Sequence, residues 1–223
     1  MSYSRFAIYY VPPKGALAKA GATWLGWDVA AGCEVSQPDF PGLRDVTNAP
    51  HKYGFHGTLK PPFRLKDEAE VEDLENATSA LAKSLPPAMC AGLEMTVLGH
   101  FLALTPCGDL GSLRQMATAC VRTLDAFRAL ASNAELARRR KSGLSPLQEK
   151  MLTQWGYPYV MEAFKFHLTL TGRLTDEAIF TWSERVQNHL PELPVPFIVD
   201  QIALCGERTD GRFEILHRYA LSG

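Results

Sequence analysis

The chain has 223 residues, of which 46% are hydrophobic and 21% are charged, and its formal net charge is -1. These values are typical of a globular protein that buries a sizeable core, and the near-neutral charge excludes a chain-wide electrostatic attraction to nucleic acid or to an anionic membrane. No stretch is long and apolar enough to span a membrane, and the first residues lack the pattern of a secretory signal. We therefore expect a cytoplasmic protein without a membrane partner.

The predicted elements mix short strands with separate helices. Aromatic and β-branched runs predict strands, helical periodicity predicts helices, and clusters of Gly, Pro, Asp and Asn predict loops. Up to residue 130 these signals give strands at residues 5–11, 53–60, 93–98 and 101–105, helices at 16–27, 67–84 and 112–130, and a long loop at 28–50. Beyond residue 130 they give two helical pieces within 134–155, a strand at 163–171, a helix at 176–190, and a hairpin of 195–205 with 212–219.

This order of elements, with antiparallel hairpins and helices that do not alternate strictly with strands, indicates an α+β fold. The five cysteines are scattered, and none has the CxxC spacing of a zinc or redox motif. The odd count argues against a secreted disulfide framework, so we expect reduced thiols packed in the core. The sequence has no Gly-rich dinucleotide fingerprint and no P-loop, and we expect neither a cofactor nor a metal.

One short pattern occurs twice. Residues 53–63 read YGFHGTLKPPF and residues 164–173 read FKFHLTLTGR, so Phe-His-x-Thr-Leu appears once in each half of the chain. Successive side chains of a strand point to opposite faces, which gives each predicted strand an apolar face and a polar face. The polar face of the first strand carries His56, Thr58 and Lys60, and that of the second carries Lys165, His167, Thr169 and Arg173.

These residue types suit the cleavage of a phosphodiester. Two imidazoles titrate near neutral pH and can share the roles of general base and general acid. The hydroxyls of Thr58 and Thr169 can donate to phosphate oxygens, and nearby cations add positive potential. The alternative from the same pattern is two solvent-facing strands of an antiparallel sheet whose histidines do nothing. The repetition of four residue types at the same spacing favours the functional interpretation.

The two motifs, His56-Gly57-Thr58-Leu59 and His167-Leu168-Thr169-Leu170, resemble the paired HxTx motifs of the 2H (two-histidine) phosphoesterase superfamily. The segments RFAIYYVPP, PHKYGFHGTLKPPFRL and RRRKSGLSPLQEKMLTQWGYPYVMEAFKFHLTLTGRL are similar to a branch associated with phosphonate-utilisation genes, a domain of unknown function. The resemblance covers nearly the whole chain. It implies one bilobal α+β domain over residues 1–223, with two pseudosymmetric lobes, each an antiparallel sheet with helices, around a central groove.

The resemblance also implies a metal-independent cyclic phosphodiesterase, with His56 and His167 as the acid-base pair and Thr58 and Thr169 on the scissile phosphate. Which histidine is the base stays open. The predicted substrate is a small phosphorylated molecule, either a sugar phosphate such as a cyclic ribosyl phosphate or a nucleotide. We predict supporting contacts from Lys60, Lys165, Arg173 and Tyr53.

Two other functions remain open from the sequence. One is an RNA-end-processing enzyme, either a 2′,3′-cyclic phosphodiesterase or a 2′-5′ ligase-like protein, and the other is a noncatalytic protein that binds a phosphorylated metabolite. The basic run at residues 138–141 could reach a second phosphate or RNA, although such runs are more often solvated helix faces. The sequence determines neither the direction of ring opening nor the oligomeric state.

Overall fold

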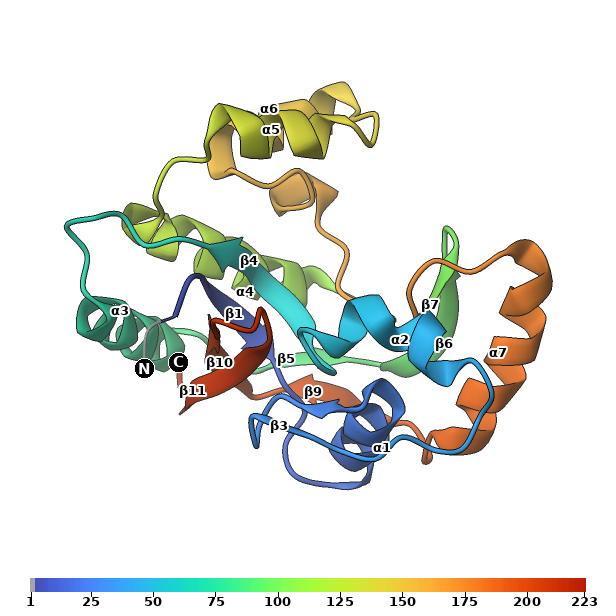
Figure 1. Ribbon diagram of the computed structural model, residues 1–223. Helices are drawn as coiled ribbons and strands as arrows, with labels where there is room; N and C mark the ends of the chain where they lie inside the picture. Colours follow the sequence, from blue (N-terminus) through green and yellow to red (C-terminus); the bar gives the residue numbers. More distant parts are fainter. Residues whose placement is uncertain (1–2) are drawn as a thin grey trace.

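A seven-stranded antiparallel sheet forms the centre of the computed structural model, which describes residues 3–223 (Figure 1). Its strand order is β11-β10-β1-β4-β8-β7-β6, so the strands that carry the two motifs, β4 and β8, are neighbours in the middle. The predicted α+β class is confirmed. The strands are β1 Phe6–Tyr10, β4 Gly57–Phe63, β6 Gly92–Leu98, β7 Phe101–Cys107, β8 Leu168–Thr169, β10 Gln201–Glu207 and β11 Phe213–Ala220.

Helices pack mainly against one face of this sheet. The main hydrophobic core joins that face to residues of α1, α2, α3, α4 and α7. Two short pairs, β2 with β3 and β5 with β9, lie outside the main sheet. The bounds are α1 Ala16–Leu25, α2 Leu43–His51, α3 Val71–Ser84, α4 Gly111–Thr123, η1 Leu124–Phe127, α5 Asn133–Arg140, α6 Pro146–Trp155, η2 Met161–Ala163, α7 Asp176–His189, β2 Trp27–Asp28, β3 Cys33–Glu34, β5 Ala88–Cys90 and β9 Phe197–Val199.

The alternation of β1 shows the two faces of the sheet. Ile8 belongs to the main core, whereas the next residue, Tyr9, packs in a second cluster with Trp27, Val29 and Phe213. Both residues are fully buried. The second cluster thus lies on the sheet face opposite the main core, and we refer to this side as the Tyr9 face.

The loop predicted at 28–50 is wrong, because α2 occupies its second half. Leu43 and Thr47 are one turn apart and buried, and the Thr47 hydroxyl donates to the Leu43 carbonyl over 2.7 Å. Pro50 sits in the last turn and has no N–H for the carbonyl of Val46. That carbonyl accepts from the backbone N–H of Gly172 at 2.6 Å instead, which ties α2 to the segment after β8.

The break predicted between the two helical pieces of 134–155 is confirmed. A capping box of Ser132 and Glu135 begins α5, and a second of Ser145 and Gln148 begins α6. Each box satisfies backbone N–H groups that have no partner within the helix. Between the helices, Gly143 has φ 71°, a left-handed conformation that glycine adopts without strain.

Strand lengths differ from the prediction at both motifs. β4 continues through two prolines to Phe63. Beyond Gly57 it pairs with β1 alone, because its pairing with β8 is confined to Gly57. The other edge of β4 is therefore unpaired there, and prolines are tolerated because no backbone N–H is needed on that edge. β8 is confined to two residues instead of the nine at 163–171. Its backbone nevertheless joins both neighbours, since Leu168 pairs with Gly57 on β4 and with Leu104 on β7.

Candidate active site

The register between β4 and β8 brings the two motifs together. Gly57 lies directly opposite Leu168 in an antiparallel pair. In such a pair the residues one position before and after also lie opposite each other. Two opposite residues point to the same side of the sheet, with their Cβ atoms about 4.5–5.5 Å apart. Residues that lie diagonally across the two strands are about 7–8 Å apart. This arrangement gathers both motif histidines and both motif threonines on the Tyr9 face, with His56 across from Thr169 and Thr58 across from His167.

Two hydrogen bonds and an aromatic stack fix the position of the His56 ring. Its Nδ1–H donates to the carbonyl of Gly54 over 3.1 Å, and its Nε2 accepts from the hydroxyl of Thr58 over 3.0 Å. The ring stacks on Tyr9 with centroids 3.6 Å apart and planes 20° apart. Only 7% of the residue is exposed. These contacts fix the tautomer with a lone pair on Nε2, the atom beside Thr58.

Burial lowers the pKa of His56 to about 3; the hydrogen bond to Gly54 opposes this shift, and the nearby His167 lowers the pKa further. The imidazole is therefore neutral at pH 7. A neutral ring with an unprotonated Nε2 can accept a proton, which is the requirement for a general base.

His167 repeats the same backbone contact. Its Nδ1–H donates to the carbonyl of Lys165 over 2.8 Å, as His56 donates to the carbonyl two residues before it. Its ring lies 5.7 Å from that of Phe101. Burial lowers the pKa of His167, and the hydrogen bond to Lys165 opposes the shift. His167 as a whole residue is less buried than His56.

A shallow cavity of about 440 Å³ opens beside the second motif. His167, Thr169 and Arg173 line it, together with Tyr53 and the Gly99-His100 turn between β6 and β7. Tyr53 connects this cavity to His56, because its ring meets the imidazole edge-on with centroids 5.3 Å apart. Burial raises the pKa of Tyr53 to about 12, and a hydrogen bond with Thr169 opposes the shift.

The prediction that Lys60 faces the groove is wrong. Thr58 lies opposite Tyr9 whereas Lys60 lies opposite Ile8, and these two residues of β1 point to different faces. The register shift between them is a β-bulge, which breaks the alternation that the sequence suggested. The Lys60 ammonium is buried, donates to the carbonyl of Val121 over 3.3 Å, and lies 3.5 Å from the carboxylate of Asp125.

The other predicted residues have mixed positions. Tyr53 and Arg173 lie at the cavity, whereas Lys165 contributes its carbonyl to His167 and has an exposed side chain. Tyr9 is a site residue that the sequence did not indicate. Its strand was predicted, but a contact with His56 depends on the pairing of β1 with β4, for which the sequence carries no local signal.

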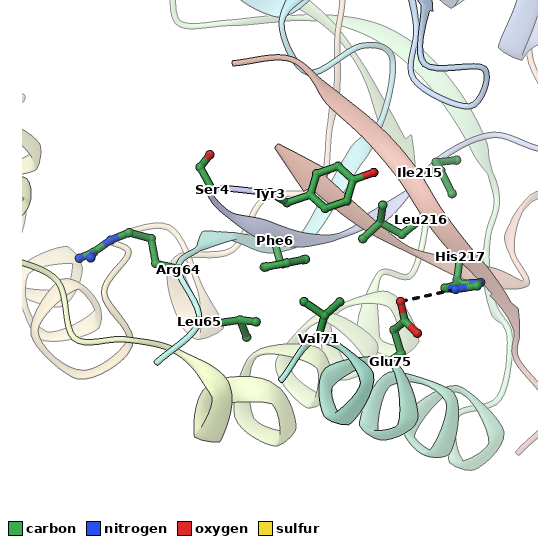
Figure 2. A pocket seen from close by; sticks show the side chains of 10 residues that line it. All are labelled: Tyr3, Ser4, Phe6, Arg64, Leu65, Val71, Glu75, Ile215, Leu216 and His217. Carbon is green, nitrogen blue, oxygen red and sulfur yellow. Dashed lines mark ion pairs between the residues drawn. The ribbon is translucent and has the colours of Figure 1, made fainter. Parts of the chain in front are cut away.

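Another cavity lies elsewhere on the molecule. It has about 850 Å³ and lies between β1, α3 and β11, where the His217 ring lies 3.5 Å from the carboxylate of Glu75 (Figure 2). It shares no lining residue with the cavity beside His167.

Within residues 3–223, no group of three or more His, Cys, Asp or Glu side chains could hold a metal ion. None of the helices in this range is long and apolar enough to cross a membrane.

Comparison with known proteins identifies relatives. Residues 58–214 match the family described as "Protein of unknown function (DUF1045)". A protein named ribose 1,5-bisphosphate phosphokinase PhnN from Janthinobacterium sp. (strain Marseille) is 34% identical over 221 residues, which cover 94% of this chain and 49% of that protein. Its namesake from Laribacter hongkongensis (strain HLHK9) is 32% identical over 188 residues, which cover 83% and 44%. The chain spans about half the length of these relatives.

Solved structures with a similar arrangement are more distant. E. coli LigT complexed with 3'-AMP has 16% identity and a TM-score of 0.49 over 100% of both chains. A structure described as a phosphoesterase has 17% identity and a TM-score of 0.46 over 100% of both chains. The protein TT0787 of Thermus thermophilus has 18% identity and a TM-score of 0.45 over 98% of both chains.

Proposed function

This chain belongs to the DUF1045 family of proteins of unknown function, and we propose that it is a phosphoesterase that opens a cyclic phosphodiester of a small sugar phosphate. One observation carries the proposal. Two imidazoles with the same tautomer, each next to a threonine hydroxyl, lie on one face of two adjacent strands. This set of groups contains a proton acceptor, a proton donor once one ring is protonated, and two donors for phosphate oxygens.

The reaction we propose is an in-line attack of water on phosphorus. One imidazole takes a proton from the attacking water as the new P–O bond forms. The opposite P–O bond breaks, and the second imidazole, as imidazolium, gives its proton to the leaving oxygen. The product is a phosphomonoester with a free hydroxyl. When the substrate binds, the hydroxyl of Thr58 turns from the Nε2 of His56 to a nonbridging oxygen, which also frees Nε2 to accept the proton of water. Thr169 donates to another nonbridging oxygen, and charge on these oxygens increases during the reaction.

The environments of the two rings support an assignment of roles. His56 is the more deeply buried ring and its pKa is lowered to about 3, so protonation before catalysis is difficult. His167 is more accessible, and the negative charge of a bound phosphate raises the pKa of an adjacent imidazole. We therefore assign the base to His56 and the acid to His167.

The curated relatives suggest the sugar. Their name gives ribose 1,5-bisphosphate as the molecule that is phosphorylated. The chain described here has no P-loop sequence for a nucleoside triphosphate, so we do not assign it the kinase step. Opening a 1,2-cyclic phosphate of ribose 5-phosphate by cleavage at the 2-oxygen would yield ribose 1,5-bisphosphate. In this proposal the chain supplies ribose 1,5-bisphosphate, which is the molecule that a ribose 1,5-bisphosphate phosphokinase consumes.

The test is a screen of cyclic phosphates of ribose and of nucleosides, followed by phosphorus NMR. We expect a cyclic resonance to convert to a phosphomonoester resonance, and His56→Ala or His167→Ala to reduce turnover by about 10²–10⁴-fold with the fold retained. EDTA should leave the rate unchanged. Full turnover in both variants would refute the mechanism. If the cyclic phosphates raise the thermal stability of the folded protein but are not hydrolysed, the chain is a binding protein instead.

A further inference from the structure

The two motifs differ in what lies against their imidazoles. In both, Nδ1–H donates to the carbonyl two residues earlier. The ring of His56 is also stacked on that of Tyr9, with centroids 3.6 Å and planes 20° apart. His167 has no stacked ring among residues 3–223, and the ring of Phe101 lies 5.7 Å from it at a tilt of 57°. The stack therefore distinguishes the histidine that we assign as the base from the one that we assign as the acid.

A β-bulge places Tyr9 beside the first motif. A regular ladder that continued from Ile8 would place Tyr9 opposite Leu59, which belongs to the main core. The register shift after Ile8 instead places Tyr9 opposite Thr58. Opposite residues share a face of the sheet, so the Tyr9 ring projects toward His56. Bulges are common next to active sites, where they change the direction of a side chain.

Tyr9 is itself fixed in place. Only 1% of the residue is exposed. Its ring lies 5.8 Å from that of Phe213, in the cluster that also contains Trp27 and Val29. The indole N–H of Trp27 donates to the carbonyl of Phe213 over 2.7 Å, which ties this cluster to β11. The ring that contacts His56 therefore has no space in which to move aside.

Substrate binding makes this stack more important. In the free protein the Nε2 of His56 accepts from the hydroxyl of Thr58. In the proposed reaction that hydroxyl turns to a phosphate oxygen, so the imidazole loses this bond as it begins to act as a base. The bond from Nδ1 to Gly54 remains, but a single hydrogen bond tolerates a rotation of about 30°. The ring of Tyr9, in van der Waals contact with the imidazole, blocks rotation out of the plane.

We propose that Tyr9 is a positioning residue of the phosphoesterase reaction, whose ring keeps the Nε2 of His56 directed at the attacking water after Thr58 has turned to the phosphate. The inference rests on the proposed function, because it concerns how the proposed base is held. The face of the ring makes the contact, so the phenol oxygen is not required. A residue that only packed the core would affect the stability of the protein and leave turnover by the folded protein unchanged.

The kinetic test measures hydrolysis of a cyclic phosphate by wild type, Tyr9→Leu, Tyr9→Phe and Phe6→Leu. Phe6 lies on the same strand and is similarly buried, but in the main core, so its variant controls for the loss of a buried aromatic ring. We expect Tyr9→Leu to lower kcat by about 10–100-fold and to change KM less than twofold, because a misplaced base affects the chemical step and not binding. Tyr9→Phe and Phe6→Leu should keep kcat within about threefold.

Two results would overturn the inference. One is an unchanged kcat in Tyr9→Leu, and the other is an equal loss of kcat in Phe6→Leu. Circular dichroism establishes that each variant is folded under the assay conditions. If Tyr9→Leu does not fold, Tyr9→Met takes its place, since its longer side chain fills more of the space without presenting a flat face.

Nitrogen NMR of the histidine rings tests the inference without turnover. It is measured in the Thr58→Val background, which removes the hydrogen bond that the substrate would displace, and His56→Gln assigns the signals. With Tyr9 present, the two ring nitrogens of His56 should have the widely separated shifts of a single Nδ1–H tautomer. Adding Tyr9→Leu should bring the two shifts closer, because a loosened ring exchanges between tautomers, whereas adding Tyr9→Phe should not.

The NMR comparison also separates this inference from the proposed function. If wild type hydrolyses none of the cyclic phosphates, the phosphoesterase proposal fails, but the shifts still show whether Tyr9 fixes the ring. Identical His56 shifts with and without Tyr9→Leu would refute the positioning role, whatever the activity.

Discussion

The burial of His56 predicts a specific loss of stability in mild acid. The ring is 7% exposed, and its pKa is lowered from 6.5 to about 3 in the folded state. An unfolded chain binds a proton at this ring below pH 6.5, whereas the folded chain does not. The stabilisation that depends on the neutral ring is complete above pH 6.5 and is lost as pH falls toward 3. At pH 5 the loss is about 2 kcal/mol, since one pKa unit corresponds to about 1.4 kcal/mol.

Urea unfolding at pH 7.5 and pH 5.0 measures this effect. Other groups also titrate, so the informative quantity is the difference between wild type and His56→Gln, which keeps a polar side chain but does not titrate. Wild type should lose about 2 kcal/mol more than His56→Gln between the two pH values. His217→Gln, which removes an exposed histidine, should behave like wild type. Equal losses in wild type and His56→Gln would show that the ring is protonated in the folded protein and refute the reasoning.

Three further outcomes follow from the site and its strands. Thr58→Val or Thr169→Val should lower kcat by about 10²-fold in steady-state assays with unchanged circular dichroism, because each removes a donor to the phosphate oxygens; an unchanged kcat would exclude that contact. Lys60→Met should change KM less than twofold, because the Lys60 ammonium bonds to the Val121 carbonyl and the Asp125 carboxylate. A large rise in KM would show that Lys60 contacts the substrate. Gly57→Ala should lower the free energy of unfolding by about 1–3 kcal/mol, because the new Cβ would lie 2.2 Å from the Phe166 ring. Phe166→Leu in the Gly57→Ala background should recover part of that loss, and no recovery would contradict the clash.

The sequence predicted the properties that depend on local alternation. Phe55 and Leu59 of the first motif strand, and Phe166 and Leu168 of the second, are buried in the main core as their spacing indicated. The histidines and threonines of the two motifs alternate with these buried residues, so the sequence also predicted that they share the other face of the sheet. These features need only the two-residue period of an extended chain, which is visible in a single segment.

Features that depend on a neighbouring strand were not predictable. Lys60 has the parity of Thr58 in the sequence, but a bulge against β1 turns it to the opposite face. Tyr9 gives no sign of its stack on His56 until the register of β1 and β4 is known. The α2 helix was hidden by Pro50, whose missing hydrogen bond is replaced by one from Gly172, over a hundred residues away. Such compensation between distant segments leaves no periodic signal in either one.

The pairing of Gly57 with Leu168 also has a consequence for how the protein folds. These residues are 111 positions apart, so a large loop must close before they meet, and the conformational entropy lost at that step is not offset by local contacts. The helices, by contrast, form between near neighbours in the chain. Activity should therefore be among the last properties that a refolding molecule regains, and a chain still being synthesised has no functional centre until its second motif has left the ribosome.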